Sequence, residues 1–547
     1  MREMLEGGDL DVLTGDYLAE LTMLILGRDR REDAGLGYAR TFLTQLRDCL
    51  RLALDRRVKI VTNAGGVNPS ALATAIRAVA AEQGLSPTVA LVRGDELGAG
   101  RHAYLGGFGI ARAMDADIVV TGRVTDASLV VGPAVARFGW GRDDLDRLAG
   151  ATVAGHVIEC GTQATGGNYP FFTEIEDLAH PGFPIAEVHE DGSSVITKHP
   201  GTGGAVTVGT VTAQLVYEVQ DARYLGPDVT TRLDTVSLRQ EGPDRVRVDG
   251  VRGEAPPPTL KVSQTAVAGY RNEMSVVLTG LDIEAKAALF RRQFEAGLRR
   301  RPAELTWDLA RLDVPDAATE RQASALLTVV ARDPEHKVVD RPFSNAAVEV
   351  ALGSYPGFFA TTPPGPAHPY GVFTAGFVPQ DEPVHEVVHD DGSVSRIAPP
   401  VFRDRLDTGR ARSTPTLLRV GTSRATGYDR KPEPSTRRLP LGTIVGARSG
   451  DKGGDANVGL WVRDPDAYPW LANLIVAERV RELLPETADR PIRITELPNI
   501  LAVNVVIEGL LGQGVAYGAR FDPQAKGLGE WLRSRHVDIP LELLEAP

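Results

Sequence analysis

Cysteine is scarce in this sequence, and long apolar runs are absent. Only Cys49 and Cys160 occur among 547 residues, so a disulfide-stapled, secreted fold is not expected. No apolar run reaches the roughly 18 to 20 residues that a membrane-spanning helix needs. The first residues, MREMLEGGDLDVL, show no signal-peptide pattern. We therefore expect a cytoplasmic protein that has no membrane partner.

Positive charge is also in deficit. Lys and Arg number 60 against 72 Asp and Glu, which gives a formal net charge of −12. A protein that binds nucleic acid needs a basic surface, so nucleic acid is not expected as a partner. A local basic pocket for an anionic small molecule is still compatible with this charge.

Two kinds of ligand site lack their usual sequence pattern. Neither a Walker motif nor a G-x-G-x-x-G spacing is present, so an ordinary dinucleotide site has no support. We predict no metal site and no tightly bound cofactor, with Mg²⁺ held by a few carboxylates as the alternative. The histidines that lie without zinc-ligand spacing are His180, His189, His199 and His368.

Three strand-then-turn units stand near the beginning of the chain. Residues 58–61, 88–92 and 117–120 are short apolar runs that polar turns follow. The helical pattern after the first run begins with Asn68 as its N-cap and stops at Gly84. Buried strands that alternate with helices indicate parallel βαβ units, so we predict an α/β domain with a Rossmann-like, mainly parallel sheet. In such sheets ligands bind beyond the carboxyl ends of the strands.

The length and the changes of pattern predict further parts. Period-two patterns over about 185–280 predict an antiparallel β-rich extension of a first domain, 1–377, and residues 282–301 have the pattern of an amphipathic helix. Residues 378–438 gain Pro, Asp and Arg and are interpreted as a linker. Residues 439–547 are predicted to form a ferredoxin-like α+β domain that docks on the first domain. Its strands are expected near 441–447, 456–463, 491–496 and 501–507, and its helices near 471–484 and 526–535.

Acid–base side chains crowd into GHVIECGTQATGG, residues 155–167. If the preceding helical pattern continues, His156 and Glu159 share a face at i and i+3, as do Glu159 and Gln163 at i and i+4. A carboxylate that orients an imidazole is a common general base near neutral pH, so both are predicted to be catalytic. Cys160 is a candidate nucleophile. The alternative interpretation is a buried small side chain at position 160 and a hydrogen-bonded histidine at a helix end.

Two polar turns, TNAGGVNP and TGRVTDAS, follow the predicted strands. The glycines permit close backbone approach, and the helix N-terminus that follows suits an anion. Arg123 offers a planar fork for a carboxylate or phosphate, and Asp126 either holds it or acts as an acid. The alternative is plain turn chemistry with Asp126 as a helix cap. The predicted ligand contacts in these turns are Thr62, Asn63, Gly65, Gly66, Asn68, Thr121 and Arg123.

The stretch RSGDKGGDANVG, residues 448–459, concentrates charged side chains among glycines. We predict that Arg448 and Lys452 provide cationic contacts to an acidic substrate, with a solvated hairpin loop as the alternative. The further predicted ligand contacts in this stretch and around it are Gln163, Gly166, Gly167, Asn168, Ser449, Asp451 and Asn504.

Several long motifs in order resemble the acyclic terpene utilisation (AtuA-type) family, with its ferredoxin-fold partner domain fused at the C-terminus. The motifs are GDYLAELTM (15–23), IVTNAGGVNP (60–69), ADIVVTGRVTDASLVVGP (116–133), GHVIECGTQATGGN (155–168), KHPGTGGAVTVGTVTAQLVYE (198–218), SYPGF (354–358) and ARSGDKGGDANVG (447–459). The resemblance implies the degradation of branched, isoprenoid-like acids as CoA thioesters, by a hydration or carbon–carbon lyase step. Family members usually begin with an additional strand and a glycine-rich turn, whereas Met1 here falls inside the helix that ends at LDVLTGDYLAE.

The residues and the resemblance together predict an enzyme that acts on a branched acyl-CoA or a related acyl thioester, with CoA as part of the substrate. His156 with Glu159 is the predicted base, the glycine turns supply contacts to the carbonyl oxygen, and Arg123, Arg448 or Lys452 holds the anionic group. The alternatives are an anion-site hydrolase on a phosphate or carboxylate and a non-catalytic binding scaffold. A homo-oligomer is expected, because the β-rich middle part offers strand edges that need a cover.

Overall fold

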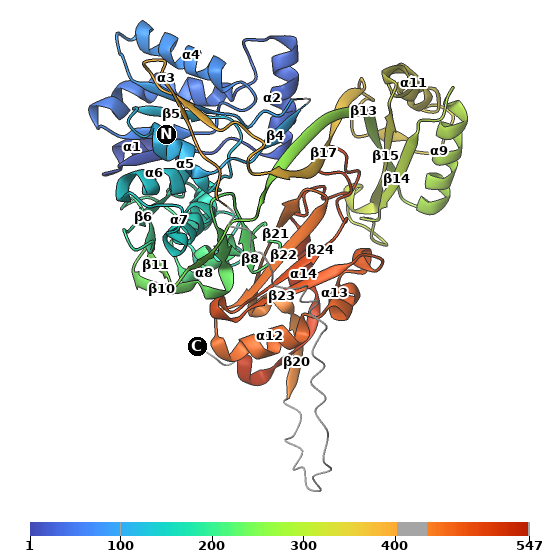
Figure 1. Ribbon diagram of the computed structural model, residues 1–547. Helices are drawn as coiled ribbons and strands as arrows, with labels where there is room; N and C mark the ends of the chain where they lie inside the picture. The colour runs from blue at the N-terminus through green and yellow to red at the C-terminus, as the bar shows by residue number, and fades with distance from the viewer. Residues whose placement is uncertain (99, 402–434, 545–547) are drawn as a thin grey trace, which may run out of the picture. The chain divides into compact units, whose positions relative to one another are not determined.

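The computed structural model describes residues 1–98, 100–401 and 435–544, which form two compact units. The first unit comprises Met1–Ser263, Ala375–Leu510 and Ala525–Pro547, and the second comprises Gln264–Thr374 and Leu511–Gln524 (Figure 1). In the described ranges no helix is both long and apolar enough to cross a bilayer.

A six-stranded sheet lies at the centre of the N-terminal part of the first unit. Its order is β1 (Val12–Gly15), β2 (Lys59–Thr62), β5 (Ile118–Thr121), β3 (Val89–Arg93), β18 (Glu386–Val388) and β19 (Val394–Arg396). The first four strands pair in parallel, and β18 pairs antiparallel with β3 and β19. The three predicted strands are confirmed, and the fold is mixed α/β. The Rossmann-like description stays a prediction, because β5 lies between β2 and β3 and this order differs from that of dinucleotide-binding folds.

Strand β1 was not predicted. Helix α1 (Arg2–Glu6) ends early, and the chain then enters the sheet beside β2. The helix predicted to end at LDVLTGDYLAE is therefore wrong beyond Glu6, because Val12–Gly15 is a strand. Because β1 is a strand, Asp16 comes directly after the carboxyl end of a parallel strand, next to the turn after β2.

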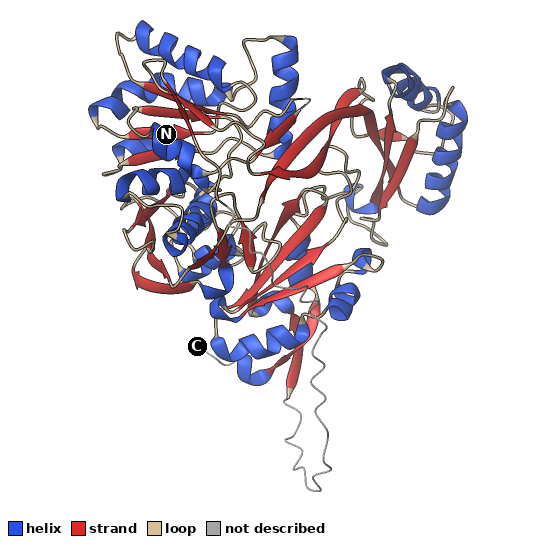
Figure 2. Ribbon diagram, viewed as in Figure 1, coloured by secondary structure: helices blue, strands red, loops and turns tan. Residues whose placement is uncertain are grey.

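Helices connect the parallel strands and cover the sheet (Figure 2). The predicted start of α4 is confirmed, because the Asn68 side chain accepts a hydrogen bond from the Ala71 N–H, and Gly84 follows the helix end with a positive φ of +66°. The helix that follows the third predicted strand begins at Ser128. The helices of this part are α2 (Glu20–Glu32), α3 (Arg40–Asp55), α4 (Pro69–Glu82), α5 (Gly107–Ala113), α6 (Ser128–Phe138), α7 (Leu145–Ile158) and α8 (Val208–Leu215).

Helix α7 is the most deeply placed helix of this part, since every residue from Leu148 to Val157 is buried. It contacts α6, α8, β6, β9 and β12. Small residues allow this close packing: a Cβ added at Gly155 would lie 2.7 Å from the Ala127 Cα. The C-terminal turn of α7 therefore carries its side chains into the interior rather than to the surface.

The middle of the chain forms antiparallel strands, as its period-two pattern predicts. One sheet has the order β10 (Ser237–Gly242), β11 (Arg245–Asp249), β7 (Ser194–Lys198) and β6 (Pro184–Val188). A second has the order β12 (Arg252–Glu254), β9 (Thr230–Arg232) and β8 (Arg223–Leu225). Strand β4 (Arg101–Ala103) lies outside these two sheets.

The second unit is an antiparallel sheet that packs against helices. Its core is aromatic: Phe290, Phe294 and Phe343 are fully buried. The predicted helix at 282–301 is confirmed as α9 (Ile283–Gly297). The strand order is β14 (Glu304–Ala310), β15 (Ser324–Asp333), β13 (Thr259–Thr279) and β16 (Phe359–Ala360), with β17 (His368–Pro379) also paired to β13 and with helices α10 (His336–Val339) and α11 (Arg341–Glu349).

The C-terminal module, residues 435–510 and 525–544, belongs to the first unit. Its sheet has the order β21 (Val445–Lys452), β22 (Asp455–Val462), β24 (Ala502–Ile507) and β23 (Ile492–Leu497), all antiparallel. The predicted helix at 471–484 is two helices, α12 (Tyr468–Leu474) and α13 (Ala477–Leu483), and α14 (Leu528–Ser534) follows later. Strand β20 (Thr436–Pro440) pairs with β25 (His536–Pro540).

The C-terminal module shares a hydrophobic core with the rest of the first unit. Trp461, Leu497 and Ile500 are buried in the same cluster as Leu148 and Val211. The predicted docking of this module is therefore confirmed. In the range interpreted as a linker, residues 386–388 and 394–396 are strands of the central sheet, and residues 402–434 lie outside the described residues.

Candidate functional site

The end of helix α7 places His156 against Glu159. The histidine is 2% exposed, and its Nδ1 lies 3.0 Å from Glu159 Oε1, which is the contact predicted from the i, i+3 spacing. Because a carboxylate accepts hydrogen bonds only, Nδ1 carries the hydrogen of the neutral ring and Nε2 is left as an acceptor. Both Nε2 and Glu159 Oε2 are buried and have no hydrogen-bond partner among the described residues. The Tyr224 ring packs beside the imidazole, with the ring centres 5.2 Å apart.

Arg123 and Asp126 follow β5 and approach each other. Arg123 Nη2 lies 3.2 Å from Asp126 Oδ1, and Nη1 donates to the Leu18 carbonyl at 2.7 Å. The guanidinium also lies over the Tyr104 ring, 4.1 Å from its centre. Its backbone N–H donates to Asp95 Oδ2 at 3.0 Å. These contacts fix the guanidinium in one position, while its Nε makes no hydrogen bond to any residue that the structure describes.

The Asp126 carboxyl lies in surroundings that favour its neutral form. Its side chain is 31% exposed, but Oδ1 itself is buried. Burial raises the pKa of Asp126 well above its usual range, and the charges of Asp16 and Glu159 raise it further against the opposing effect of Arg123. We infer that Asp126 holds its proton where an ordinary aspartate has lost it.

Asp16 is a member of the site that the sequence did not suggest. Asn63 Nδ2 donates to Asp16 Oδ1 at 2.6 Å, and Asn63 Oδ1 accepts from the Tyr17 N–H at 2.8 Å. Burial raises the pKa of Asp16 to about 6, since it outweighs the hydrogen bond from Asn63, and the charge of Glu159 adds to the rise. Asn63, which was predicted to contact a ligand, therefore donates a hydrogen bond to Asp16 instead. Asp16 could have been predicted as a site residue if β1 had been recognised, because it is the polar residue that follows this strand.

A second charged pair, Glu20 and Lys261, completes the surroundings. Lys261 Nζ lies 3.6 Å from Glu20 Oε1, and the Tyr104 hydroxyl donates to the same oxygen at 3.4 Å. Burial opposes the charge of Glu20, but Lys261, Arg123 and Lys452 together lower its pKa to about 2. Burial, with the charge of Lys452, lowers the pKa of Lys261 to about 8. Neither residue was predicted as a site residue, because their contact joins α2 to β13 and is a tertiary interaction.

Lys452 brings a cation from the C-terminal module. It is the last residue of β21, at the hairpin that leads into β22. Burial opposes its charge, but Tyr224, Glu218, Glu20 and Glu159 raise the pKa of Lys452 above its usual range. The ammonium group is therefore stabilised by carboxylates, and the module contributes directly to the electrostatics around Glu159. We call the following residues the acid–base cluster: Asp16, Glu20, Tyr104, Arg123, Asp126, His156, Glu159, Tyr224, Lys261 and Lys452.

The nominated residues of the first glycine turn make contacts within the protein. Thr62 Oγ1 donates to the Gly15 carbonyl at 2.8 Å, and Thr121 Oγ1 donates to the Gly122 carbonyl at 2.9 Å. A Cβ at Gly65 would lie 2.3 Å from the Thr121 carbonyl oxygen, so only glycine permits these two turns to meet. Gly66 packs in the same turn, and Asn68 caps α4. These residues shape the edge of the sheet that holds Asp16 and Arg123.

The stretch after α7 forms a turn beside the C-terminal module. Gln163 Oε1 accepts a hydrogen bond from Arg448 Nη2. The Gly167 N–H donates to the Thr162 carbonyl at 2.8 Å, and the Gly166 N–H donates to the Gln163 carbonyl at 3.3 Å. Asn168 is exposed. Gln163 therefore links the two parts of the unit.

Most of the residues nominated in the C-terminal module hold that module in place. The Arg448 guanidinium lies over the Tyr217 ring, 4.5 Å from its centre, and Ser449 Oγ accepts from the Gly529 N–H at 2.8 Å. Asn504 Nδ2 donates to the Val219 carbonyl at 2.9 Å. Asp451 Oδ1 lies 3.6 Å from Lys526 Nζ, and burial, with the charge of Glu218, raises the pKa of Asp451 to about 6.

Cys160 is poorly suited to act as a nucleophile. Burial raises the pKa of the Cys160 thiol, and the charges of Glu159 and Glu218 raise it further. The thiolate is the reactive form, so this thiol is unreactive near neutral pH.

We therefore expect the Cys160→Ser variant to keep its kcat within a few-fold of the wild-type value. Serine is close in size to cysteine, and the His156–Glu159 contact does not involve the thiol. Initial rates on an acyl thioester, together with a thermal melt, measure this. If the folded variant loses all activity while His156→Ala retains it, the thiol forms a covalent intermediate and the base assignment is wrong.

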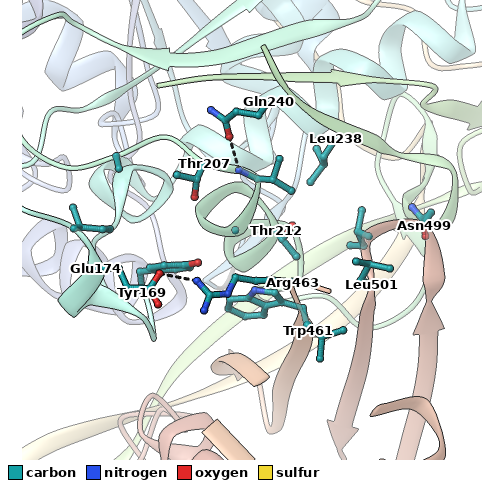
Figure 3. A pocket seen from close by; sticks show the side chains of 16 residues that line it. Tyr169, Glu174, Thr207, Thr212, Leu238, Gln240, Trp461, Arg463, Asn499 and Leu501 are labelled. Carbon is teal, nitrogen blue, oxygen red and sulfur yellow. Dashed lines mark hydrogen bonds and ion pairs between the residues drawn. The ribbon is translucent and has the colours of Figure 1, made fainter. Parts of the chain in front are cut away.

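Among the described residues, no group of three His, Cys, Asp or Glu side chains has an arrangement that could hold a metal ion. A cavity of about 450 Å³ lies elsewhere in the first unit, between α8, β10 and the C-terminal module (Figure 3). None of the sixteen residues that line it belongs to the acid–base cluster. The buried polar groups, not this cavity, therefore mark the candidate site.

Comparison with family models gives two matches. The model described as acyclic terpene utilisation family protein AtuA matches residues 1–101 and 99–389, and the model described as AtuA ferredoxin-like domain matches residues 439–538. Searches of curated proteins and of solved structures found no match. The two family matches cover the helix end with His156, the turn with Arg123 and the hairpin with Lys452.

Proposed function

The chain belongs to the acyclic terpene utilisation (AtuA) family, and we propose that it is an enzyme acting on a branched or isoprenoid-like acyl-CoA, or a related acyl thioester. The reaction we propose is hydration–dehydration or carbon–carbon cleavage. One observation carries this proposal. Four polar atoms of the acid–base cluster are buried and make no hydrogen bond within the part of the chain that the structure describes. They are Arg123 Nε, His156 Nε2, Glu159 Oε2 and Asp126 Oδ1, the last of which has only its ion-pair contact with Arg123. Buried polar atoms almost always have partners in folded proteins, so a group of four points to a bound substrate.

His156 is the base in this proposal. Glu159 accepts from Nδ1–H, which orients the ring and leaves Nε2 free to take a proton. In a dehydration, Nε2 takes the proton from the carbon next to the thioester carbonyl. In a cleavage of the retro-aldol type, Nε2 takes the proton of the β-hydroxyl group, the bond between the α and β carbons breaks, and the β carbon becomes a carbonyl. The α carbon leaves as the thioester enolate and takes the proton back from the imidazolium.

Asp126 is the acid. With its raised pKa it carries a proton, which it donates to the β-hydroxyl oxygen as the carbon–oxygen bond breaks and water leaves. In the hydration direction the same groups act in reverse. Arg123 and Lys452 bring positive charge to the cluster, and this favours the negative charge that develops on the thioester oxygen.

A hydrolase that captures a free anion has less support. Lys261 already pairs with Glu20, whose lowered pKa keeps it ionised, so this cation is engaged with a carboxylate. The Cys160 thiol has a raised pKa, which disfavours a thiolate nucleophile.

Ligand-dependent melting of the whole protein tests the substrate class. We expect a branched acyl-CoA to raise Tm, since a ligand that binds only the folded state stabilises it by mass action. The corresponding free acid and inorganic phosphate should raise Tm much less. A rise with phosphate or the free acid alone would favour the hydrolase, and no rise with any of the three would favour a binding scaffold.

A further inference from the structure

The cavity of about 450 Å³ has the size of a small-molecule site and lies where two parts of the first unit meet. Helix α8 and strand β10 form one side, and the end of β22 with the turn Pro498–Ile500 forms the other (Figure 3). Its wall includes apolar side chains from both sides, among them Val208, Leu238 and Ile500.

The two amide side chains of this wall, Gln240 and Asn499, are hydrogen-bonded within the protein. Gln240 Oε1 accepts from the Val208 N–H at 3.1 Å, and Gln240 Nε2 donates to the Gly242 carbonyl at 2.8 Å. Asn499 Nδ2 donates to two carbonyl oxygens at 2.9 Å each. These amides therefore hold the wall in shape and do not need a ligand.

The charged groups of the wall neutralise each other. Arg463 Nη1 lies 2.6 Å from Glu174 Oε2, and both side chains are about half exposed, 51% each (Figure 3). The Arg463 guanidinium also lies over the Phe171 ring at 4.3 Å. An ionised ligand would have to leave water without gaining an unpaired counter-charge, so a neutral ligand is favoured.

Trp461 supplies a polar group of the wall that calls for a partner. It is 1% exposed, and its Nε1 is buried and has no acceptor in the described ranges of the chain. Tyr169 stacks on its ring, with the centres 6.3 Å apart and the planes 24° apart. A buried N–H without an acceptor is unfavourable, and a ligand oxygen would satisfy it.

We propose that this cavity is a second binding site, which takes a small, neutral, mainly apolar molecule with one oxygen acceptor, such as a medium-chain alcohol. The oxygen accepts from Trp461 Nε1, and the chain lies against the apolar wall. The site is separate from the acid–base cluster, so the proposal does not depend on the reaction proposed above. A ligand in it contacts both sides of the junction and stabilises the attachment of the C-terminal module.

Titration calorimetry on the whole protein, with 1-octanol as the probe and octanoate and octylammonium for comparison, tests the site. We expect one octanol to bind per chain, and octanoate and octylammonium to bind at least about tenfold more weakly because their charge has no counter-ion there. Trp461→Phe keeps an aromatic ring and removes the N–H, so it should weaken octanol binding roughly 3- to 10-fold. Trp531→Phe, the same change at a residue that does not line the cavity, should leave binding unchanged.

Val208→Trp fills the cavity from its surface side and should abolish binding. This variant tests whether octanol binds in the cavity even if Trp461→Phe fails to fold. No binding up to the solubility limit of octanol, or equal binding by Val208→Trp, overturns the site. Binding that Val208→Trp removes but Trp461→Phe leaves intact overturns the role of the indole, and tighter binding of octanoate or octylammonium overturns the neutral ligand class.

Discussion

Replacing His156 with alanine should lower kcat by roughly 10²- to 10⁴-fold, which is the usual contribution of a positioned general base. The reason is geometric: Nε2 is the free nitrogen of a buried ring that Glu159 holds by Nδ1 at 3.0 Å. Initial rates with a branched acyl-CoA measure this change. KM should move much less than kcat, because the loss occurs in the proton-transfer step.

Two further variants separate catalysis from structure. His180→Gln changes an exposed histidine and should leave kcat unchanged. Glu159→Gln keeps the size of the side chain but removes the carboxylate that orients the imidazole, so its loss should be smaller than that of His156→Ala. If His156→Ala is folded and retains full activity, another group of the cluster takes the proton.

The three buried strands of the central sheet could be predicted because each contains a short apolar run, IV, VALV or IVV, that a polar turn follows. Strand β1 could not, since its four residues include only Val12 and Leu13 as apolar members and all four are only partly buried. Asp16 was missed for the same reason. The position of a short, half-buried strand is decided by its pairing with β2, which is a tertiary interaction.

The local part of the site was predictable, and the assembled part was not. The contact of His156 with Glu159 follows from helix geometry alone. Glu20 meets Lys261 across more than two hundred residues of chain, and Lys452 comes near Glu159 only because the C-terminal module docks. Arg448 and Asn504 look like ligand contacts in the sequence, yet their partners are Gln163 and the Val219 carbonyl. A sequence shows which side chains can bind a ligand, but packing decides which of them are already occupied.

Asp126→Asn is expected to lower kcat by roughly 10²-fold or more, because an amide cannot deliver a proton to the departing oxygen. It should also change the pH profile. In the wild type, kcat falls as the pH rises through the raised pKa of Asp126, since the acid loses its proton there. The variant should lack this fall. Rates measured across neutral and alkaline pH check both effects, and Asp143→Asn, at an exposed aspartate, is the matched control.

The same substitution should act in the opposite direction on stability. Burial raises the pKa of Asp126 in the folded protein, so the unfolded chain loses this proton first as the pH rises. The wild type therefore loses stability between the pKa of Asp126 in the unfolded chain and its pKa in the folded protein. Asparagine has no proton to lose, so the Tm of Asp126→Asn relative to the wild type should increase with pH over that window. Thermal melts at several pH values measure the difference. A variant that is inactive and whose relative Tm falls with pH would mean that Asp126 is ionised in the folded state and acts as the partner of Arg123, not as an acid.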